Sequence, residues 1–180
     1  MSLGLQRGKV KLTPYDPVWA ALFAEEKQGI ADVFGEKLLG IEHIGSTAIP
    51  GMDAKPILDL MIAVASIDDY EDEGTILEKV GYTFGRDMRE EHQHVLFVKG
   101  PDENRTHYLK LTTLDSQFWQ EKLLFRDYLI SHPERAEAYR QLKHQLLEQY
   151  AGERAEYTDG KADFVKKTLQ LAQEDFLQRR

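Results

Sequence analysis

A glycine–serine turn and an aspartate inside an apolar strand stand close together between residues 43 and 61. Gly45 and Ser46 leave a predicted strand; glycine lets the backbone approach a ligand closely, and a serine hydroxyl with nearby N–H groups can bind phosphate oxygens. Asp59 interrupts the apolar run 56–62, where a charge is costly unless it is paired, hydrogen-bonded or metal-bound. A strand carboxylate that holds Mg²⁺ beside a turn that holds phosphates is what metal-dependent phosphoryl transfer requires.

The same residues also have an ordinary structural interpretation. Turns that contain Gly-Ser are common in proteins of every kind, so this motif alone has low specificity. A buried aspartate such as Asp59 could cap a loop, or it could pair with Lys55 or Arg105. On the residues alone, both a phosphate site with Asp59 as its catalytic and metal-binding residue and a purely structural arrangement remain open.

Six basic side chains form a candidate anion-binding set around the turn: Arg105, His107, Lys110, Arg126, Lys143 and Lys161. Arg105 and His107 share one face of a regular strand, whereas Lys110 points to the other face. At most one of His107 and Lys110 can therefore point inward with Arg105. Arg126 has an equal alternative, because it could form an internal ion pair with Asp127 that supports a helix.

Two histidines one residue apart suggest a different chemistry. His92 and His94 would lie on one face of an extended segment, and with His43 or His107 they could bind a transition metal. A metal bound in this way would be compatible with a hydrolase that uses Asp59 together with these histidines. We favour two ordinary surface or strand-edge histidines, because no third ligand stands at a fixed spacing.

Several separated motifs resemble the GrpB family, in the order His43-Ile44-Gly45-Ser46-Thr47-Ala48-Ile49-Pro50-Gly51, Ala54-Lys55-Pro56-Ile57-Leu58-Asp59, Arg105-Thr106-His107-Tyr108-Leu109-Lys110, Phe125-Arg126-Asp127-Tyr128-Leu129, and Tyr157-Thr158 with Lys161. The resemblance covers nearly the whole chain, from about residue 10 to 172. It implies membership of the nucleotidyltransferase-like superfamily, whose fold is a mixed sheet with flanking helices. The family's own reaction does not follow from the resemblance.

The superfamily pattern is a Gly-Ser turn followed by two strand carboxylates one residue apart, with a third on a later strand. The resemblance implies that Gly45, Ser46 and Thr47 hold triphosphate oxygens, that Asp59 binds Mg²⁺, and that Lys55, Arg105 or His107 neutralises phosphate charge. The second carboxylate is missing, since Ile57 and Met61 occupy the same-face positions beside Asp59. We therefore expect a domain that binds a nucleotide or another small phosphorylated ligand. It is either an Mg²⁺-dependent nucleotidyltransferase or a non-catalytic binding or adaptor module that has lost the metal pair, with no organic cofactor.

Hydrophobic spacing and turn residues indicate which elements position these residues. The predicted elements of the first part are strands at 8–12, 41–44, 57–65, 82–84, 94–98 and 106–112, and helices at 17–34 and 68–80. From residue 115 onward only helices are predicted, at 116–131, at 133–150 and from 161. The fold class is therefore α/β (α+β), a mixed sheet flanked by helices with a helical C-terminal part. We expect one domain over residues 1–180, with a core at about 8–115 and C-terminal helices at about 116–180.

Composition narrows the classes of partner. The 180 residues include 23 basic and 31 acidic side chains, giving a net charge of −8, and no cysteine, which excludes disulfides and thiol chemistry. The whole acidic excess lies in residues 1–115, and the acidic run 68–73 suits the N-terminal turn of a helix better than a calcium loop. An acidic chain without a long apolar run predicts a cytoplasmic protein with no membrane partner. The acidic charge argues against a nucleic-acid polymer as a partner, but it is compatible with a small phosphorylated ligand in a local basic pocket.

Overall fold

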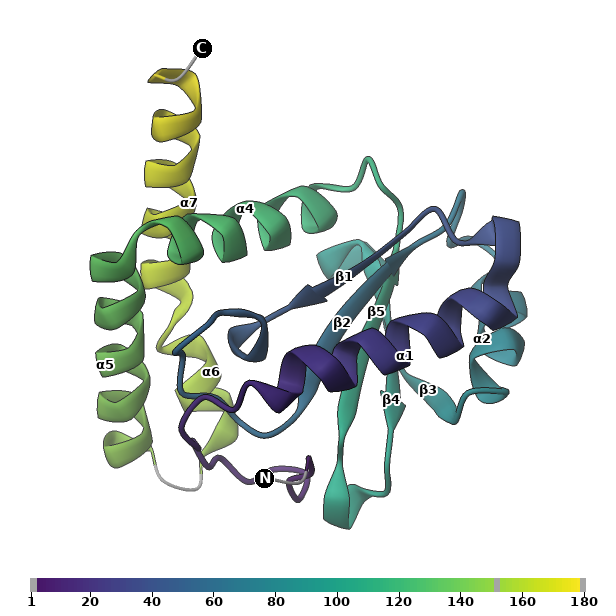
Figure 1. Ribbon diagram of the computed structural model, residues 1–180, viewed down its shortest axis with the longest axis horizontal. Coiled ribbons are helices and arrows are strands. Elements are labelled where there is room, and N and C mark those ends of the chain that lie inside the picture. The colour runs from purple at the N-terminus through teal and green to yellow at the C-terminus, as the bar shows by residue number, and fades with distance from the viewer. Residues whose placement is uncertain (1–2, 151–152, 179–180) are drawn as a thin grey trace.

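A five-stranded mixed sheet lies at the centre of the computed structural model, which describes residues 3–150 and 153–178 (Figure 1). Its strands are β1 (Gly40–Ile44), β2 (Leu58–Ala63), β3 (Tyr82–Met88), β4 (His94–Lys99) and β5 (His107–Thr112), in the order β1-β2-β5-β4-β3. Only β2 and β5 run parallel; the other neighbours are antiparallel. The two central strands thus come from segments about 50 residues apart, and they bring Asp59 level with Tyr108.

One face of the sheet is covered by α1 (Val18–Phe34) and α2 (Tyr70–Glu78). Because side chains alternate along a strand, Leu58, Leu60 and Ile62 all point to this face, where they pack with Trp19 of α1 and Leu77 of α2. The apolar stripe predicted for the first helix forms this core. Three acidic residues of the predicted helix at 68–80, namely Glu71, Asp72 and Glu73, lie in the first turn of α2, where the helix dipole favours them.

The opposite face of the sheet is only partly apolar. Ile44, Met61 and Ala63 pack there against Trp119 of α4 (Gln117–Ser131), whose N-terminus is capped by the Ser116 side chain. Asp59 and Lys110 point to this same face, beyond the apolar cluster. The change from apolar to charged side chains along β2 therefore creates a polar region between the sheet and the C-terminal helices.

The C-terminal part is helical, as predicted. α5 (Pro133–Gln149), α6 (Arg154–Asp159) and α7 (Ala162–Gln178) follow α4, and Figure 1 shows them gathered on the β1 side of the sheet, with α7 extending past the rest of the molecule. Pro133 begins α5 at a position that needs no backbone donor. The fold is therefore mixed α/β with a helical C-terminal part, as the sequence indicated.

Three local predictions need correction. Residues 8–12 form no strand, because the chain there pairs only through isolated bridges on either side, Leu5 with Arg105 and Thr13 with Ala54. β3 is longer than predicted, since it continues past a bulge next to Gly85. The short helices α3 (Arg89–His92) and α6 were not predicted, because neither has enough residues to show a helical period.

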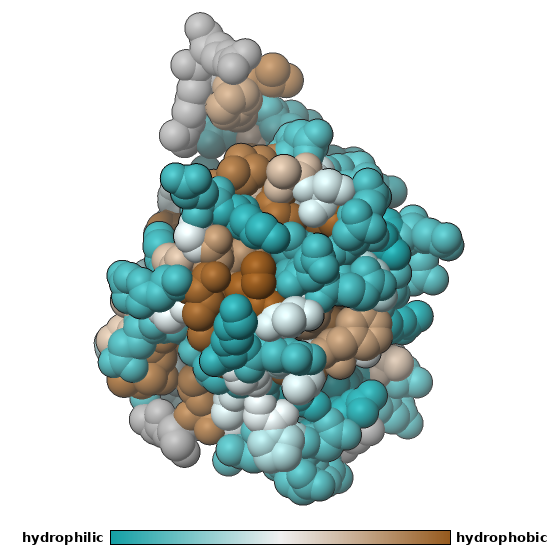
Figure 2. All heavy atoms as spheres, turned by 90° about the vertical axis from the view of Figure 1, so that its right-hand side faces the viewer, coloured by the Kyte–Doolittle hydropathy of each residue, from teal (hydrophilic) through white to brown (hydrophobic). Residues whose placement is uncertain are grey.

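The outer face beside α2 and β3 is mainly hydrophilic, with some apolar side chains exposed near its centre (Figure 2). Phe84 of β3 is one exposed apolar side chain of the molecule, and its ring stacks on Tyr70. None of the helices among residues 3–150 and 153–178 combines the length and apolar character needed to cross a bilayer.

Candidate functional site

The turn after β1 lies directly against the Asp59 carboxylate. Ile44 pairs with Asp59 across the antiparallel β1–β2 ladder, so the next residue, Gly45, passes over the aspartate side chain. Gly45 has a φ of 71°, and a Cβ atom at this position would lie 3.0 Å from Asp59 Oδ2. Glycine is thus required here both for the backbone angle and for the close approach, as the sequence pattern predicted.

Asp59 forms an ion pair with Lys110 of β5. Lys110 lies opposite Met61 in the parallel ladder and reaches diagonally to Asp59 on the same face. The side chain of Asp59 is 33% exposed and that of Lys110 16% exposed, so the pair borders solvent. The partner of Asp59 is therefore Lys110, which the sequence did not suggest, and neither Lys55 nor Arg105, the two partners that it did suggest, forms an ion pair with Asp59 within the described residues.

His43 and Thr47 stabilise the turn through contacts of their side chains. The His43 ring stacks on Phe23 of α1 at a centroid distance of 4.7 Å, and its Nε2 lies 2.9 Å from the Thr47 hydroxyl. Burial lowers the pKa of His43 to about 4, although Asp59 opposes this shift. A neutral imidazole at neutral pH fits a positioning role for His43, with the buried Thr47 as its partner.

A small pocket of about 110 Å³ opens beside the turn, lined by Ser46, Thr47, Asp59 and three lysines, Lys55, Lys143 and Lys161. Two of the lysines lie over the Tyr157 ring, with Lys55 Nζ 5.0 Å and Lys161 Nζ 4.6 Å from the ring centroid. Burial and the neighbouring cations lower the pKa of Lys55 to about 8, and burial lowers that of Lys161 to about 8. No carboxylate within the described part of the chain forms an ion pair with Lys55, Lys143 or Lys161.

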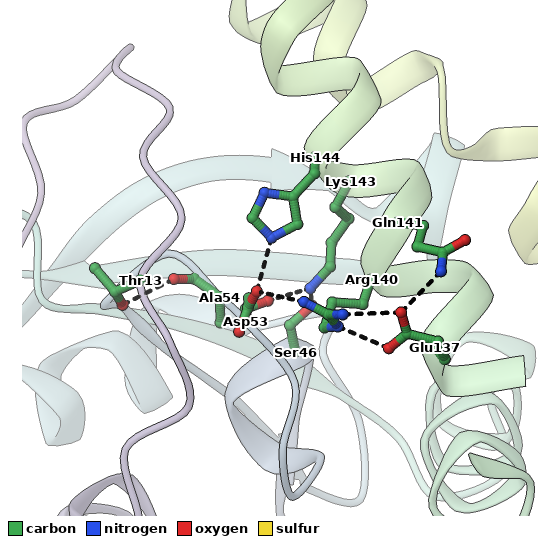
Figure 3. A network of polar contacts seen from close by, with 9 residues as sticks. All are labelled: Thr13, Ser46, Asp53, Ala54, Glu137, Arg140, Gln141, Lys143 and His144. Atoms are coloured by element: carbon green, nitrogen blue, oxygen red, sulfur yellow. Dashed lines mark hydrogen bonds and ion pairs between the residues drawn. The ribbon is translucent and has the colours of Figure 1, made fainter. Parts of the chain in front are cut away.

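The third lysine is held by α5. Lys143 is 2% exposed, and its Nζ donates to Ser46 Oγ at 3.2 Å and to the Asp53 carbonyl. Figure 3 shows Lys143 pointing from α5 toward the turn, alongside a polar network in which the Asp53 carboxylate accepts from Arg140 at 3.4 Å and lies 2.7 Å from His144 Nε2. Burial, Lys161 and Arg140 lower the pKa of Lys143 to about 7 against the opposing effect of Asp53.

A wider cleft of about 670 Å³ adjoins the small pocket. Asp59 and Lys161 line both spaces, so they mark the boundary between them. The remaining lining of the cleft is mainly polar, and it includes Gly45, Lys110, Lys122, His92, His94 and Phe118. The cleft volume falls within the range of about 300–1,000 Å³ that is usual for small-molecule sites. A ligand larger than one phosphate group therefore has room to extend from the pocket along the sheet.

Two members of the predicted basic set lie elsewhere. His107 points to the α1 face, where its Nε2 is 3.8 Å from Glu26 Oε2, and Arg105 is buried against Asp102 near the N-terminal segment. The parallel β2–β5 register decides this, because it turns Lys110 and not His107 toward Asp59. The predicted convergence of Arg105 and His107 on the Gly-Ser turn is not present in the structure.

Arg126 also binds partners that give it a structural role. It donates from NH1 to Glu42 Oε2 at 2.7 Å and to the His43 carbonyl at 2.8 Å, and from Nε to Asp127 at 2.7 Å. It ties α4 to β1 and lines neither the pocket nor the cleft. The structure therefore favours the ion-pair alternative for Arg126.

The histidines do not converge. His92 and His94 both line the cleft with stacked rings 6.1 Å apart, and burial lowers the pKa of His94 to about 4. His43 contacts Thr47, and His107 lies across the sheet. Among residues 3–150 and 153–178, no three His, Asp or Glu side chains are arranged to hold a metal ion.

The lack of such a group among the described residues also bears on Mg²⁺. Ile57 and Met61 beside Asp59 are both buried apolar residues, and Met61 belongs to the cluster around Trp119. The cleft carboxylates Glu90, Glu91 and Glu121 form no metal-binding group with Asp59 in the described structure. The site therefore does not fit a two-metal mechanism, and we derive no transfer step through Mg²⁺.

Sequence reasoning found the turn, Asp59, Lys55, Lys143 and Lys161, but it missed the network that orders them. Asp53, Arg140 and His144 gave no signal of their own, because a single acid in a loop and two basic residues on an amphipathic helix are common. The helical spacing of Arg140, Lys143 and His144 places the three on neighbouring turns of α5, which is a pattern that could have identified them.

Comparison with known proteins identifies relatives of this chain. The family model described as GrpB protein matches residues 9–171. The chain belongs to the GrpB family. The Glutamate-rich protein GrpB of Alkalihalophilus pseudofirmus is 35% identical over 171 residues, which cover 93% of this chain and 98% of that protein. A UPF0157 protein of Pseudomonas aeruginosa is 38% identical over 164 residues, which cover 89% of this chain but only 66% of that protein.

A solved structure supports the fold of the GrpB chain. The crystal structure of the conserved protein GrpB from Enterococcus faecalis matches with a TM-score of 0.82 and 32% sequence identity, covering 93% of this chain and 99% of that one. The GrpB resemblance expected from the sequence motifs is therefore confirmed. Because the names of these relatives state no reaction, the function of this GrpB chain has to be inferred from its own site.

Proposed function

We propose that this protein binds a nucleotide or another small phosphorylated ligand in the pocket between the Gly45–Ser46 turn and the C-terminal helices. The observation that carries the proposal is the set of three lysines, Lys55, Lys143 and Lys161, which share a small pocket without a carboxylate in ion-pair contact among the described residues. Burial lowers the pKa of all three lysines, and the charge of Lys161 lowers the pKa of Lys55 and Lys143 further. A bound anion would relieve both costs.

The rest of the pocket supports the same ligand class. Ser46 can donate its hydroxyl to a phosphate oxygen, and Gly45 gives close access to the backbone. The wider cleft adjoins the pocket at Asp59 and Lys161, so the remainder of a phosphorylated compound has space beside Lys110 and Lys122. Any Mg²⁺ would arrive on the ligand's own phosphates, and among the described residues Asp59 is the one carboxylate that lines the small pocket. A binding module is therefore better supported than a nucleotidyltransferase.

Calorimetric titration with ATP and with inorganic tripolyphosphate, each with and without Mg²⁺, tests the proposal. We expect wild type to bind both anions and Lys161→Ala to bind them about tenfold more weakly, as loss of one partly buried charge contact implies. Lys27→Ala is the matched control, because Lys27 is an exposed lysine on α1. Absence of binding by the folded wild type, or equal affinity of Lys161→Ala and wild type, contradicts the proposal.

A further inference from the structure

The contact between Lys143 and Ser46 has the geometry of a base and a nucleophile. Lys143 Nζ lies 3.2 Å from Ser46 Oγ, within hydrogen-bond reach, and it also contacts the Asp53 carbonyl. A neutral amine in this position can donate one N–H to the carbonyl while its lone pair accepts the serine O–H. The carbonyl contact therefore fixes the orientation in which the lone pair faces Ser46.

The surroundings of Lys143 suit a neutral amine. The side chain is buried, and its ammonium group has no carboxylate in ion-pair contact within the described structure. The charged and titratable groups that face it are Asp53 from the loop, Arg140 on its own helix, Lys161 before α7, and Tyr139, whose ring centroid is 5.1 Å from Nζ. Two cations and burial oppose one acid, and the pKa of Lys143 falls to about 7.

Ser46 is the only side-chain hydroxyl of the pocket that Lys143 contacts in the described structure. Thr47 is bonded to His43, and Tyr157 lies beneath Lys55 and Lys161. Burial raises the pKa of Tyr157 to about 12, so its hydroxyl stays protonated at neutral pH. The reactive candidate is therefore Ser46, which lines the pocket with the lysines that would hold an anionic group.

We propose that Lys143 is the general base for Ser46, and that Ser46 is a nucleophile toward the phosphoryl group of a small phosphate ester or anhydride. Ser46 Oγ bonds to phosphorus as its proton passes to Lys143 Nζ, the bond from phosphorus to the leaving oxygen breaks, and that oxygen takes the proton from the Lys143 ammonium. Water then attacks the phosphoserine, giving its proton through Lys143 to Ser46 Oγ, and inorganic phosphate leaves. Lys55 and Lys161 would hold the phosphoryl oxygens throughout.

This inference rests on the proposed anion site, which would deliver the phosphoryl group, but a neutral probe separates the two claims. A fluorophosphonate carries no charge and reacts with an activated serine by releasing fluoride. We expect peptide mass spectrometry to find the adduct on Ser46 of the wild type, and none at this position in Ser46→Ala. Lys143→Arg keeps a cation but supplies no base at neutral pH, and should slow labelling about 100-fold. The exposed-site control Lys27→Arg should label like wild type.

The dependence of labelling on pH gives a second readout that needs no folded variant. We expect the rate for wild type to rise between about pH 6 and 8, as Lys143 loses its proton. A folded wild type that is not labelled at Ser46, a rate that is flat across this range, or a folded Lys143→Arg protein that labels as fast as wild type would each overturn the inference. Tripolyphosphate binding that persists in any of these cases leaves the proposed function intact.

Discussion

Gly45 and Asp59 are in such close contact that a single methyl group added to the glycine would lie 3.0 Å from both Cβ and Oδ2 of the aspartate. The contact follows from the β1–β2 register, which pairs Ile44 with Asp59 and carries the next residue over the carboxylate. It brings the backbone of the turn next to the Asp59 carboxylate of β2. The pocket and the cleft meet at this point.

Substitution of Gly45 by alanine should therefore cost more than an ordinary glycine replacement. Gly51 is a matched control, because its φ of 77° is similar but a Cβ atom there would meet nothing within 4 Å. We expect Gly51→Ala to lower the free energy of unfolding by about 1 kcal/mol, the cost of the left-handed conformation. Gly45→Ala should lose about 1–3 kcal/mol more from the clash with Asp59. Equal losses in urea unfolding would show that the contact is not as tight as described.

Neutralising Asp59 should strengthen the binding of an anion in the absence of Mg²⁺. Asp59 places a negative charge in a pocket with Lys55, Lys143 and Lys161, so Asp59→Asn removes repulsion toward a phosphate group. We expect tripolyphosphate to bind about fivefold more tightly to Asp59→Asn, consistent with about 1 kcal/mol for one charge at partial exposure. Glu71→Gln on α2 provides the control for net charge, since Glu71 is exposed and lies outside the pocket. Weaker binding by Asp59→Asn without Mg²⁺ would assign Asp59 a direct binding role.

The lowered pKa of Lys143 makes a prediction about stability and pH. Because the folded-state pKa is about 7 and the unfolded value is near 10.4, the unfolded chain binds more protons between these values. The contribution of Lys143 to the free energy of unfolding therefore rises with pH from about 7, with a slope of up to about 1.4 kcal/mol per pH unit. Lys143→Met abolishes this slope, so the difference in free energy of unfolding, wild type minus variant, should increase from pH 6 to 9. A difference that stays constant between pH 6 and 9 would contradict the lowered pKa of Lys143.

The Asp53 network should matter for binding as well as for stability. Asp53→Ala removes the carboxylate that contacts Arg140 and His144, which hold α5 against the loop that carries Lys143's backbone partner. We expect a loss of about 1–2 kcal/mol in free energy of unfolding, together with weaker tripolyphosphate binding. Glu137→Ala is the control, because Glu137 bonds to the same arginine without contacting the loop. Binding that falls equally in both variants would remove the positioning role of Asp53.

The fold was largely predictable because its signals are local. The apolar run of β2, the alternation of β5, the helix spacing of α1, and Pro133 at the start of α5 are each signals that lie within a few neighbouring residues. The prediction of a strand at residues 8–12 was wrong because a strand also needs a partner elsewhere in the chain. The local pattern of these residues is extended, but among the described residues no strand of the sheet pairs with them.

The site was only partly predictable, because it depends on pairings between distant segments. The sequence placed Arg105 and His107 on one strand face, and it offered Lys110 as the alternative. The parallel register of β2 and β5 decides between them by turning Lys110 to Asp59 and His107 to Glu26. Nothing local in β5 encodes this choice, since it depends on which face α1 covers. The contact of Lys143 with Ser46, 97 positions apart, is of the same kind.

The position of a bound anion would show directly whether the small pocket binds phosphate. Crystals of the protein soaked with tungstate, a heavy analogue of phosphate, would reveal the anion by its strong anomalous signal. We predict tungstate in the small pocket, with oxygens at about 3 Å from Lys161 Nζ and Ser46 Oγ. Tungstate found only on exposed lysines outside the pocket, with the pocket unoccupied at saturating concentration, would contradict it.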